Sequence, residues 1–161
     1  MAADFRIVEA LDRADVAACR DLFTEYQQGL GVSLCFLGFD RELLELPGDY
    51  APPRGRLLMA VIDGDPAGCV ALRPLVDAEA EMKRLYVRPA HRGMNLGRAL
   101  ALRAIAEARA IGYRALKLDT LASMGAAQHL YARLGFVDAL RYNDNPIAGT
   151  RFMALDLRAC G

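Results

Sequence analysis

The sequence is poor in the residues that build metal sites and redox centres. Among 161 residues there are two histidines, four cysteines and no tryptophan. No two cysteines follow the C-x-x-C spacing, and so few histidines leave a zinc site without its usual ligands. Cys19 and Cys69 lie in apolar stretches, which predicts small core residues with reduced thiols in a cytoplasmic protein. We therefore expect no metal.

Long apolar runs and an excess of one charge are also absent. No stretch approaches the ~20 apolar residues that cross a bilayer, and the first fifteen residues carry acids and lack the apolar segment of a signal peptide. Lysine plus arginine number 20, as do aspartate plus glutamate, so the basic excess of a nucleic-acid-binding protein is missing. Neither a membrane nor a nucleic acid is expected as a partner.

The remaining composition and periodicity describe one globular domain over residues 1–161. The chain is 54% hydrophobic and 25% charged, as folded domains are. Helices are predicted from an N-cap at Asp12 to about Gln28, over 40–46, over 96–111, and from an N-cap at Ser123 to Gly135. Strands are predicted over 5–10, within 56–75 as a hairpin turning at 63–65, and over 79–87, 114–120, 136–140 and 150–157. This order predicts a mixed α/β sheet.

A basic turn containing small residues lies where the predicted strand 79–87 gives way to a helix. The turn contains Arg92, Gly93, Asn95, Gly97 and Arg98. The first turn of a helix leaves backbone N–H groups unpaired and concentrates partial positive charge. Small residues let a ligand approach that backbone, and the arginines add charge. The turn therefore predicts an anion site for a phosphate-bearing ligand.

Two longer stretches carry family motifs. EMKRLYVRPAHRGMNLGRAL runs from strand through turn to helix, and AAQHLYARLGF places Tyr131, Gly135 and Phe136 in a Tyr-x-x-x-Gly-Phe pattern. Their order and spacing, over roughly residues 80–137, resemble the GCN5-related N-acetyltransferase (GNAT) superfamily. The resemblance implies a single-domain, mixed, mostly antiparallel sheet flanked by helices.

The resemblance also implies acetyl-CoA as the acyl donor. Its binding residues would be Leu85, Tyr86, Val87, Arg92, Gly93, Met94, Asn95, Leu96, Gly97 and Arg98. Asn95 stands where the motif usually has its middle glycine, and asparagine tolerates left-handed backbone better than other non-glycine residues. Met124 stands where the family often has an asparagine that contacts the cofactor arm.

A free alkylamine has a pKa of about 10, so it is protonated at neutral pH. Acetyl transfer to the amine therefore needs a base that removes this proton. Glu81 lies on the strand before the turn, where the family often places a base that acts directly or through water. Glu79 shares its face in a regular strand and is the fallback. Either glutamate could instead be a solvated strand residue, which would leave water alone as the base.

Two further catalytic groups follow from the resemblance. The backbone N–H of Leu85 would meet the negative charge that develops on the thioester oxygen. Tyr131 would give a proton to the departing thiolate, although its helical spacing with Ala127 and Leu134 also fits a core tyrosine.

These features predict an N-acetyltransferase that moves an acetyl group from acetyl-CoA to a primary amine of a small molecule or peptide. Transfer is expected within a ternary complex, because no cysteine in the motifs has a base beside it. The alternative is an inactive acyl-CoA sensor module, and family members often form homodimers, which leaves that assembly open. The acceptor is not identified, but Tyr26, Phe36, Phe39 and Tyr142 are predicted as its walls.

Overall fold

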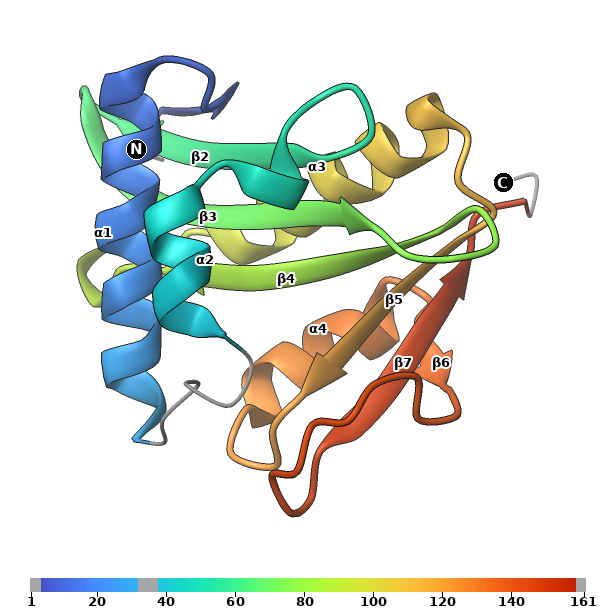
Figure 1. Cartoon of the computed structure of the whole chain (residues 1–161). Coiled ribbons are helices and arrows are strands. Elements are labelled where there is room, and N and C mark those ends of the chain that lie inside the picture. Colours follow the sequence, from blue (N-terminus) through green and yellow to red (C-terminus); the bar gives the residue numbers. More distant parts are fainter. Residues whose placement is uncertain (1–3, 32–37, 159–161) are drawn as a thin grey trace.

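The computed structural model describes residues 4–31 and 38–158. The strands are β1 (Phe5–Glu9), β2 (Arg56–Ile62), β3 (Asp65–Pro74), β4 (Glu79–Val87), β5 (Ala115–Thr120), β6 (Val137–Asp138) and β7 (Arg151–Asp156). The helices are α1 (Arg13–Leu30), α2 (Phe39–Glu45), α3 (Leu96–Ile111) and α4 (Gly125–Arg133), with short 3-10 turns η2 (Gly48–Tyr50) and η3 (Pro89–His91). One sheet has the order β1-β2-β3-β4-β5-β7-β6 (Figure 1). Among these strands β4 and β5 pair in parallel and the other neighbours pair antiparallel, which confirms the predicted fold class.

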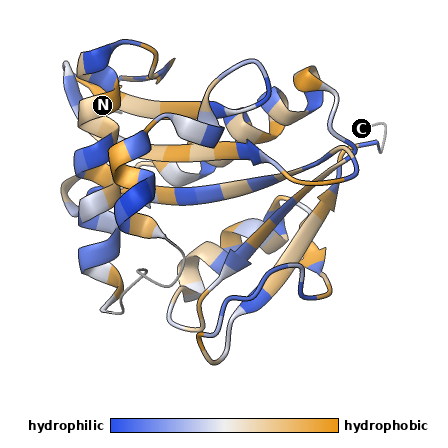
Figure 2. Cartoon of the chain, viewed as in Figure 1, coloured by the Kyte–Doolittle hydropathy of each residue, from blue (hydrophilic) through white to orange (hydrophobic). Residues whose placement is uncertain are grey.

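The helices form a layer on each face of the sheet: α1 and α2 on one, α3 and α4 on the other (Figure 1). Strand β2 explains why both layers are needed. Its odd-numbered residues from Leu57 to Val61 join the core under α1 and α2, and its even-numbered residues from Leu58 to Ile62 join the core under α3. A strand buried on both faces is apolar throughout. Strand β4 differs, because it carries hydrophilic residues along its length (Figure 2).

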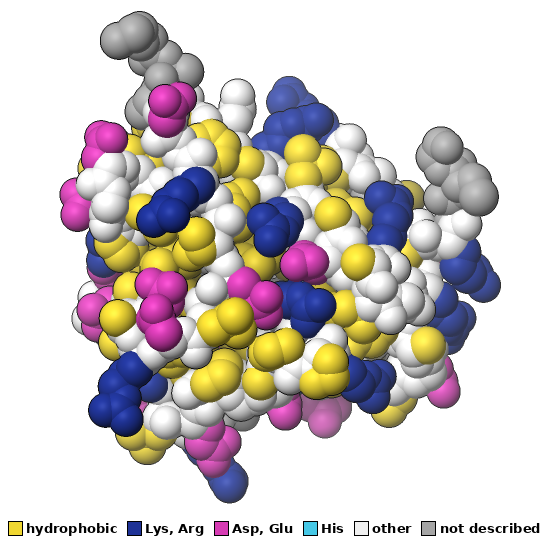
Figure 3. Space-filling view, turned by 90° about the horizontal axis from the view of Figure 1, so that it is seen from above, with side chains coloured by type: hydrophobic (Ala, Val, Ile, Leu, Met, Phe, Trp, Pro, Cys, Tyr) yellow, Lys and Arg dark blue, Asp and Glu magenta, His cyan; other side chains and the backbone are white. Residues whose placement is uncertain are grey.

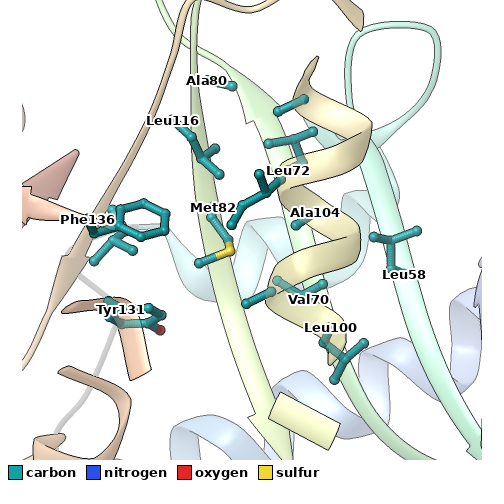
Figure 4. Packing of buried hydrophobic residues seen from close by; sticks show 14 of the residues in the cluster. Leu58, Val70, Leu72, Ala80, Met82, Leu100, Ala104, Leu116, Tyr131 and Phe136 are labelled. Carbon is teal, nitrogen blue, oxygen red and sulfur yellow. The ribbon is translucent and has the colours of Figure 1, made fainter. Parts of the chain in front are cut away.

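Helix α3 packs closely on the sheet because its inner face is rich in alanine. Ala101, Ala104 and Ala108 are fully buried, and Leu100 beside them is buried as well. Figure 4 places Leu100 and Ala104 along the helix face that covers Leu72 of β3. Interiors packed this tightly tolerate little displacement, so the first turn of α3 is held against the end of β4.

Strands β4 and β5 pair over only three described residues and then separate. Residues 79–81 of β4 pair with residues 115–117 of β5. Beyond them β5 continues to pair with β7, and β4 continues with β3 (Figure 1). One edge of β4 over residues 82–87 therefore has no neighbour among the described strands, and backbone groups on that edge are available to a ligand.

Strand β4 also contains a bulge at this split. Its register with β3 shifts by one residue between Cys69 and Ala71. Arg84 has φ 61°, a left-handed conformation that is costly for an arginine. The Arg84 guanidinium donates hydrogen bonds of 2.9 and 3.0 Å to the Glu42 carboxylate on α2. A bulge bends its strand and redirects side chains, and here an ion pair fixes it to the neighbouring layer.

Local predictions at the element ends have mixed outcomes. The N-cap at Asp12 is confirmed, since its carboxylate accepts the N–H three residues on at 2.7 Å. The N-cap at Ser123 is wrong, because the Met124 N–H bonds the Leu121 carbonyl at 2.9 Å and helix α4 begins only after that turn. The strand predicted over 136–140 is reduced to the two residues of β6.

Candidate active site

The end of β4 and the start of α3 enclose a cavity of about 440 Å³. Nine of the ten residues predicted to hold acetyl-CoA line it: Leu85, Tyr86, Val87, Arg92, Gly93, Asn95, Leu96, Gly97 and Arg98. The tenth, Met94, packs its side chain against the hydrophobic core instead. Helix α4 closes the opposite side with Ala126, Ala127 and Leu130. The residues of one contiguous motif are thus brought together with a helix that follows later in the chain.

The turn before α3 has the backbone of an anion-binding nest. Gly93 and Asn95 have φ values of 84° and 62°, both left-handed. Asn95 is the N-cap residue, and its side chain makes no capping hydrogen bond, so it substitutes for glycine through its backbone alone. Alternating left-handed residues point successive N–H groups toward one concave spot. The first turn of α3 adds its own unpaired N–H groups there.

Gly97 keeps this cavity open. A Cβ atom built on Gly97 would lie 3.8 Å from Cγ2 of Val87 and 3.9 Å from Cδ2 of Leu130. Both neighbours line the cavity, so a side chain at position 97 would occupy the space beside the nest without displacing the protein. The site therefore fits a ligand whose phosphates lie directly against the backbone.

Charged side chains surround the nest. The Arg92 Nε donates to the Val87 carbonyl at 3.0 Å, and its guanidinium lies 5.9 Å from the centre of the Tyr86 ring. Arg98 is exposed on the first turn of α3. His91 also lines the cavity. These groups could pair with phosphate oxygens.

A second, small cavity of about 40 Å³ lies in the split between β4 and β5. It is lined by, among others, Tyr26, Lys83, Leu85, Asp119, Met124 and Tyr131. Figure 4 places Tyr131 beside Phe136 with its hydroxyl turned toward β4. Tyr131 is 7% exposed, and burial raises the pKa of its hydroxyl well above the ordinary tyrosine range. It donates no hydrogen bond to a residue that the structure describes, so the proton is available to a ligand.

Glu81 is fully buried at the last paired position of β4, next to the split. Its Oε1 accepts a hydrogen bond of 2.8 Å from Arg73, and its Oε2 accepts one from the Tyr142 hydroxyl. Burial, and then the charge of Glu81, raise the pKa of Tyr142. Neither Glu81 nor its partner Tyr142 lines the small cavity, so any contact between Glu81 and a ligand there would need water.

Glu79 lies two residues further from the split. Its carboxylate pairs with Arg114 at 3.2 Å and with Lys117 at 2.9 Å. These contacts hold the paired ends of β4 and β5 together, which is a structural use of the charge.

Lys83 and Asp119 are residues that sequence reasoning missed. Each belongs to a row of charged residues at every second position of a central strand, and such a charged face is the signal that could have revealed them. Burial lowers the pKa of Lys83, against the opposing effect of Glu81. The Asp119 carboxylate accepts hydrogen bonds from the amides of Asn143 and Asn145, at 2.8 and 3.3 Å.

The residues predicted to line the acceptor site lie in different parts of the structure. Tyr26 lines the small cavity and a neighbouring one of about 310 Å³. Burial raises the pKa of Tyr26 to about 12. Phe39 is wrong as a wall, because it is buried in the core with the Arg84 guanidinium 5.1 Å from its ring centre. Phe36 lies outside the described residues.

The described residues contain no cluster of histidine, cysteine, aspartate or glutamate that could hold a metal ion. Helices long and apolar enough to cross a membrane are likewise missing from that part of the chain. On the face seen in Figure 3, basic and acidic side chains are interspersed rather than separated by sign.

Comparison with known proteins agrees with the geometry. The sequence model of the acetyltransferase (GNAT) family matches residues 17–136. An uncharacterized N-acetyltransferase of Schizosaccharomyces pombe is 39% identical over 138 residues, which cover 84% of this chain and 85% of that protein. The chain thus belongs to the GNAT acetyltransferase family, and it is an acyl-CoA-dependent acetyltransferase.

Solved structures share the fold. A GNAT-family acetyltransferase from Staphylococcus aureus superposes with a TM-score of 0.80 at 18% identity, covering 96% of this chain and 100% of that one. The paia N-acetyltransferase from Thermoplasma acidophilum, in complex with coenzyme A, superposes with a TM-score of 0.71 at 16% identity, covering 95% and 99%.

Proposed function

We propose that this protein transfers an acetyl group from acetyl-CoA to the primary amine of a small molecule or peptide, directly and within a ternary complex. The observation that carries the proposal is the cavity at the start of α3, which contains the backbone nest and shares Leu85 and Ala127 with the small cavity that Tyr131 lines. Acetyl-CoA needs a site for its phosphates and, close to it, a group that can give a proton to its sulfur. The nest would provide the first and the Tyr131 hydroxyl the second.

The nest residues Gly93 and Asn95, with Arg92 and Arg98, would hold the pyrophosphate of the donor. Acetyl-CoA supplies an acetyl group activated as a thioester. The N–H of Leu85 would donate to the thioester oxygen as that oxygen gains negative charge. This role is supported by the edge of β4 that has no neighbouring strand over residues 82–87.

The transfer combines an exchange of bonds at the acetyl carbon with two proton transfers. The amine nitrogen bonds to the acetyl carbon as the carbon–sulfur bond breaks. Tyr131 would donate its proton to the departing thiolate, and this role is supported by its position at the small cavity and by the lack of another acceptor for its hydroxyl among the described residues. The amine proton would pass by way of water and the Tyr142 hydroxyl to the Glu81 carboxylate, which accepts a hydrogen bond from Tyr142.

An amine panel tests the function. Acetyl-CoA is incubated with the protein and a set of amines, and free thiol and acetylated amine are measured together. Stoichiometric release of both is expected for at least one class of amine. Binding of acetyl-CoA without any acetylated product would instead establish the sensor alternative.

The variant Tyr131→Phe tests the proton donor. It removes one oxygen and keeps the ring packed against Phe136, whose centre lies 5.8 Å away. We expect kcat to fall about tenfold, which is about 1.4 kcal/mol, while the Kd for acetyl-CoA stays unchanged. A kcat equal to that of the wild type would return Tyr131 to a purely structural role.

The variant Glu81→Gln tests the base, with Glu79→Gln as its matched control on the same strand face. A lost base should depress kcat/KM by roughly 10²–10⁴-fold at low pH, where the amine carries its proton. The defect should shrink at high pH, where the amine loses that proton unaided. A loss that does not vary with pH, or an equal loss in Glu79→Gln, would contradict the assignment.

A further inference from the structure

Lys83 is a nearly buried cation whose ion pair is long and shared with another cation. Its side chain is 8% exposed, and its Nζ lies 4.0 Å from Oε1 of Glu81, which is its nearest ion-pair partner among the described residues. That oxygen already accepts the 2.8 Å hydrogen bond from Arg73. Lys83 makes no hydrogen bond to the part of the chain that the structure describes. A nearly buried ammonium is stabilised by a hydrogen-bonded anion, so the Lys83 ammonium can bind an anionic group of a ligand that enters the cavity.

Asp119 lies across the split from Lys83. Glu81 and Lys117 are the last paired residues of β4 and β5, and Lys83 and Asp119 come two residues further along each strand, on the same faces. Both line the small cavity, and no ion pair within 4.0 Å joins them. The amide hydrogen bonds to Asp119 reach its Oδ2 and leave Oδ1 free of any donor from the described residues.

One cation and one anion therefore face a cavity that also contains the reacting centre. Leu85 and Tyr131 line the same space of about 40 Å³, which has room for only a few atoms. A ligand that satisfied both charges there would carry its own anion and cation within a few bonds of each other. A long diamine or a peptide side-chain amine does not meet this condition.

We propose that the cavity binds the zwitterion of an α-amino acid, with the carboxylate on Lys83 and the ammonium on Asp119, and that this amino acid is the acetyl acceptor. This assignment rests on the proposed acetyltransferase function and names its substrate class. Asp119 places the ammonium near the reacting centre, and Lys83 distinguishes an amino acid from an amine that lacks a carboxylate.

The experiment compares each L-amino acid with its own carboxamide in the acetylation assay. A charge-assisted hydrogen bond makes the carboxylate form the better substrate by about 10–100-fold in kcat/KM. Lys83→Met abolishes this preference, because kcat/KM falls much more for the amino acids than for their carboxamides. Lys117→Met is the matched control: this lysine lies on the same sheet face, pairs with Glu79 and does not line the cavity. It keeps the preference.

A calorimetric titration of amino acids into the CoA-saturated protein measures amino-acid binding separately from acetyl transfer. Wild-type protein binds amino acids more tightly than carboxamides, and Lys83→Met does not. A wild type with equal kcat/KM for carboxylates and carboxamides overturns the proposal. A wild type that binds no amino acid also overturns it, even if the protein acetylates other amines. Amino-acid binding that depends on Lys83 without transfer to any amine supports the subsite and overturns the proposed function instead.

Discussion

The hydrogen bond between Tyr142 and Glu81 offers a direct perturbation of the site. Tyr142→Phe removes the hydroxyl that donates to Oε2 of the buried Glu81 carboxylate. The ring keeps its edge contact with Phe152, with centres 5.5 Å apart, so packing is preserved. The stability change therefore reports mainly the lost hydrogen bond to a buried charge.

The expected loss follows from that geometry. A hydrogen bond to a charged group contributes about 1.5–3 kcal/mol, because the carboxylate loses a donor that water cannot replace. For a chain of this length this corresponds to a decrease in Tm of about 3–12 °C. Tyr113→Phe is the matched control. Its hydroxyl donates to the neutral Arg54 carbonyl at 2.7 Å, and its loss should cost about 1 kcal/mol.

Urea denaturation at neutral pH, with melting curves beside it, measures both variants. We expect Tyr142→Phe to lose more stability than Tyr113→Phe and to lose kcat/KM as well, while Tyr113→Phe retains wild-type turnover. A Tyr142→Phe protein as stable as the wild type would refute the stabilising hydrogen bond, and one with unchanged kcat/KM on the most basic acceptor that is turned over would refute the proton path through this hydroxyl.

Two further predictions concern stability. Burial raises the pKa of Cys19 from 9.0, and that of Tyr26 from 10.0, to about 12 in each case. The unfolded chain therefore loses these protons first, and stability should fall by about 1.4 kcal/mol per pH unit for each group, above about pH 9 for Cys19 and above about pH 10 for Tyr26. Urea midpoints that stay constant up to pH ~11 would contradict this. Glu42→Gln leaves the buried Arg84 charge uncompensated and should cost about 3 kcal/mol of unfolding free energy, whereas an unchanged Tm would show that the ion pair does not hold the bulge.

The nest could be predicted from sequence because its geometry is local. Gly93, Asn95 and Gly97 lie within five consecutive residues, so their backbone conformations determine the concave surface almost independently of the rest of the fold. The same reasoning explains why Asn95 can replace the glycine of the motif. Helix periodicity likewise placed the core faces of α3 and α4 correctly.

The surroundings of Glu81 could not be predicted in this way. Its partners Arg73 and Tyr142 lie 8 and 61 positions away in the sequence. Which strands are neighbours, and where β4 and β5 separate, decides that Lys83 faces Asp119. A strand pattern shows which face of the sheet a residue occupies but not what packs against that face. The contacts of the buried charged residues could therefore be identified only once the strand order was known.

The central claim is that acetyl-CoA binds in the cavity between β4 and the first turn of α3. Calorimetric titration of acetyl-CoA into the wild type and Gly97→Val tests it most directly, with NAD as the control ligand. We expect one saturable site in the wild type and no binding of NAD. In Gly97→Val the valine would displace the phosphates from the nest, and the loss of two charge-assisted hydrogen bonds should weaken Kd by about a hundredfold or more. A wild type that binds no acetyl-CoA at millimolar concentration, or a folded Gly97→Val protein that binds it as tightly as the wild type, would contradict the claim.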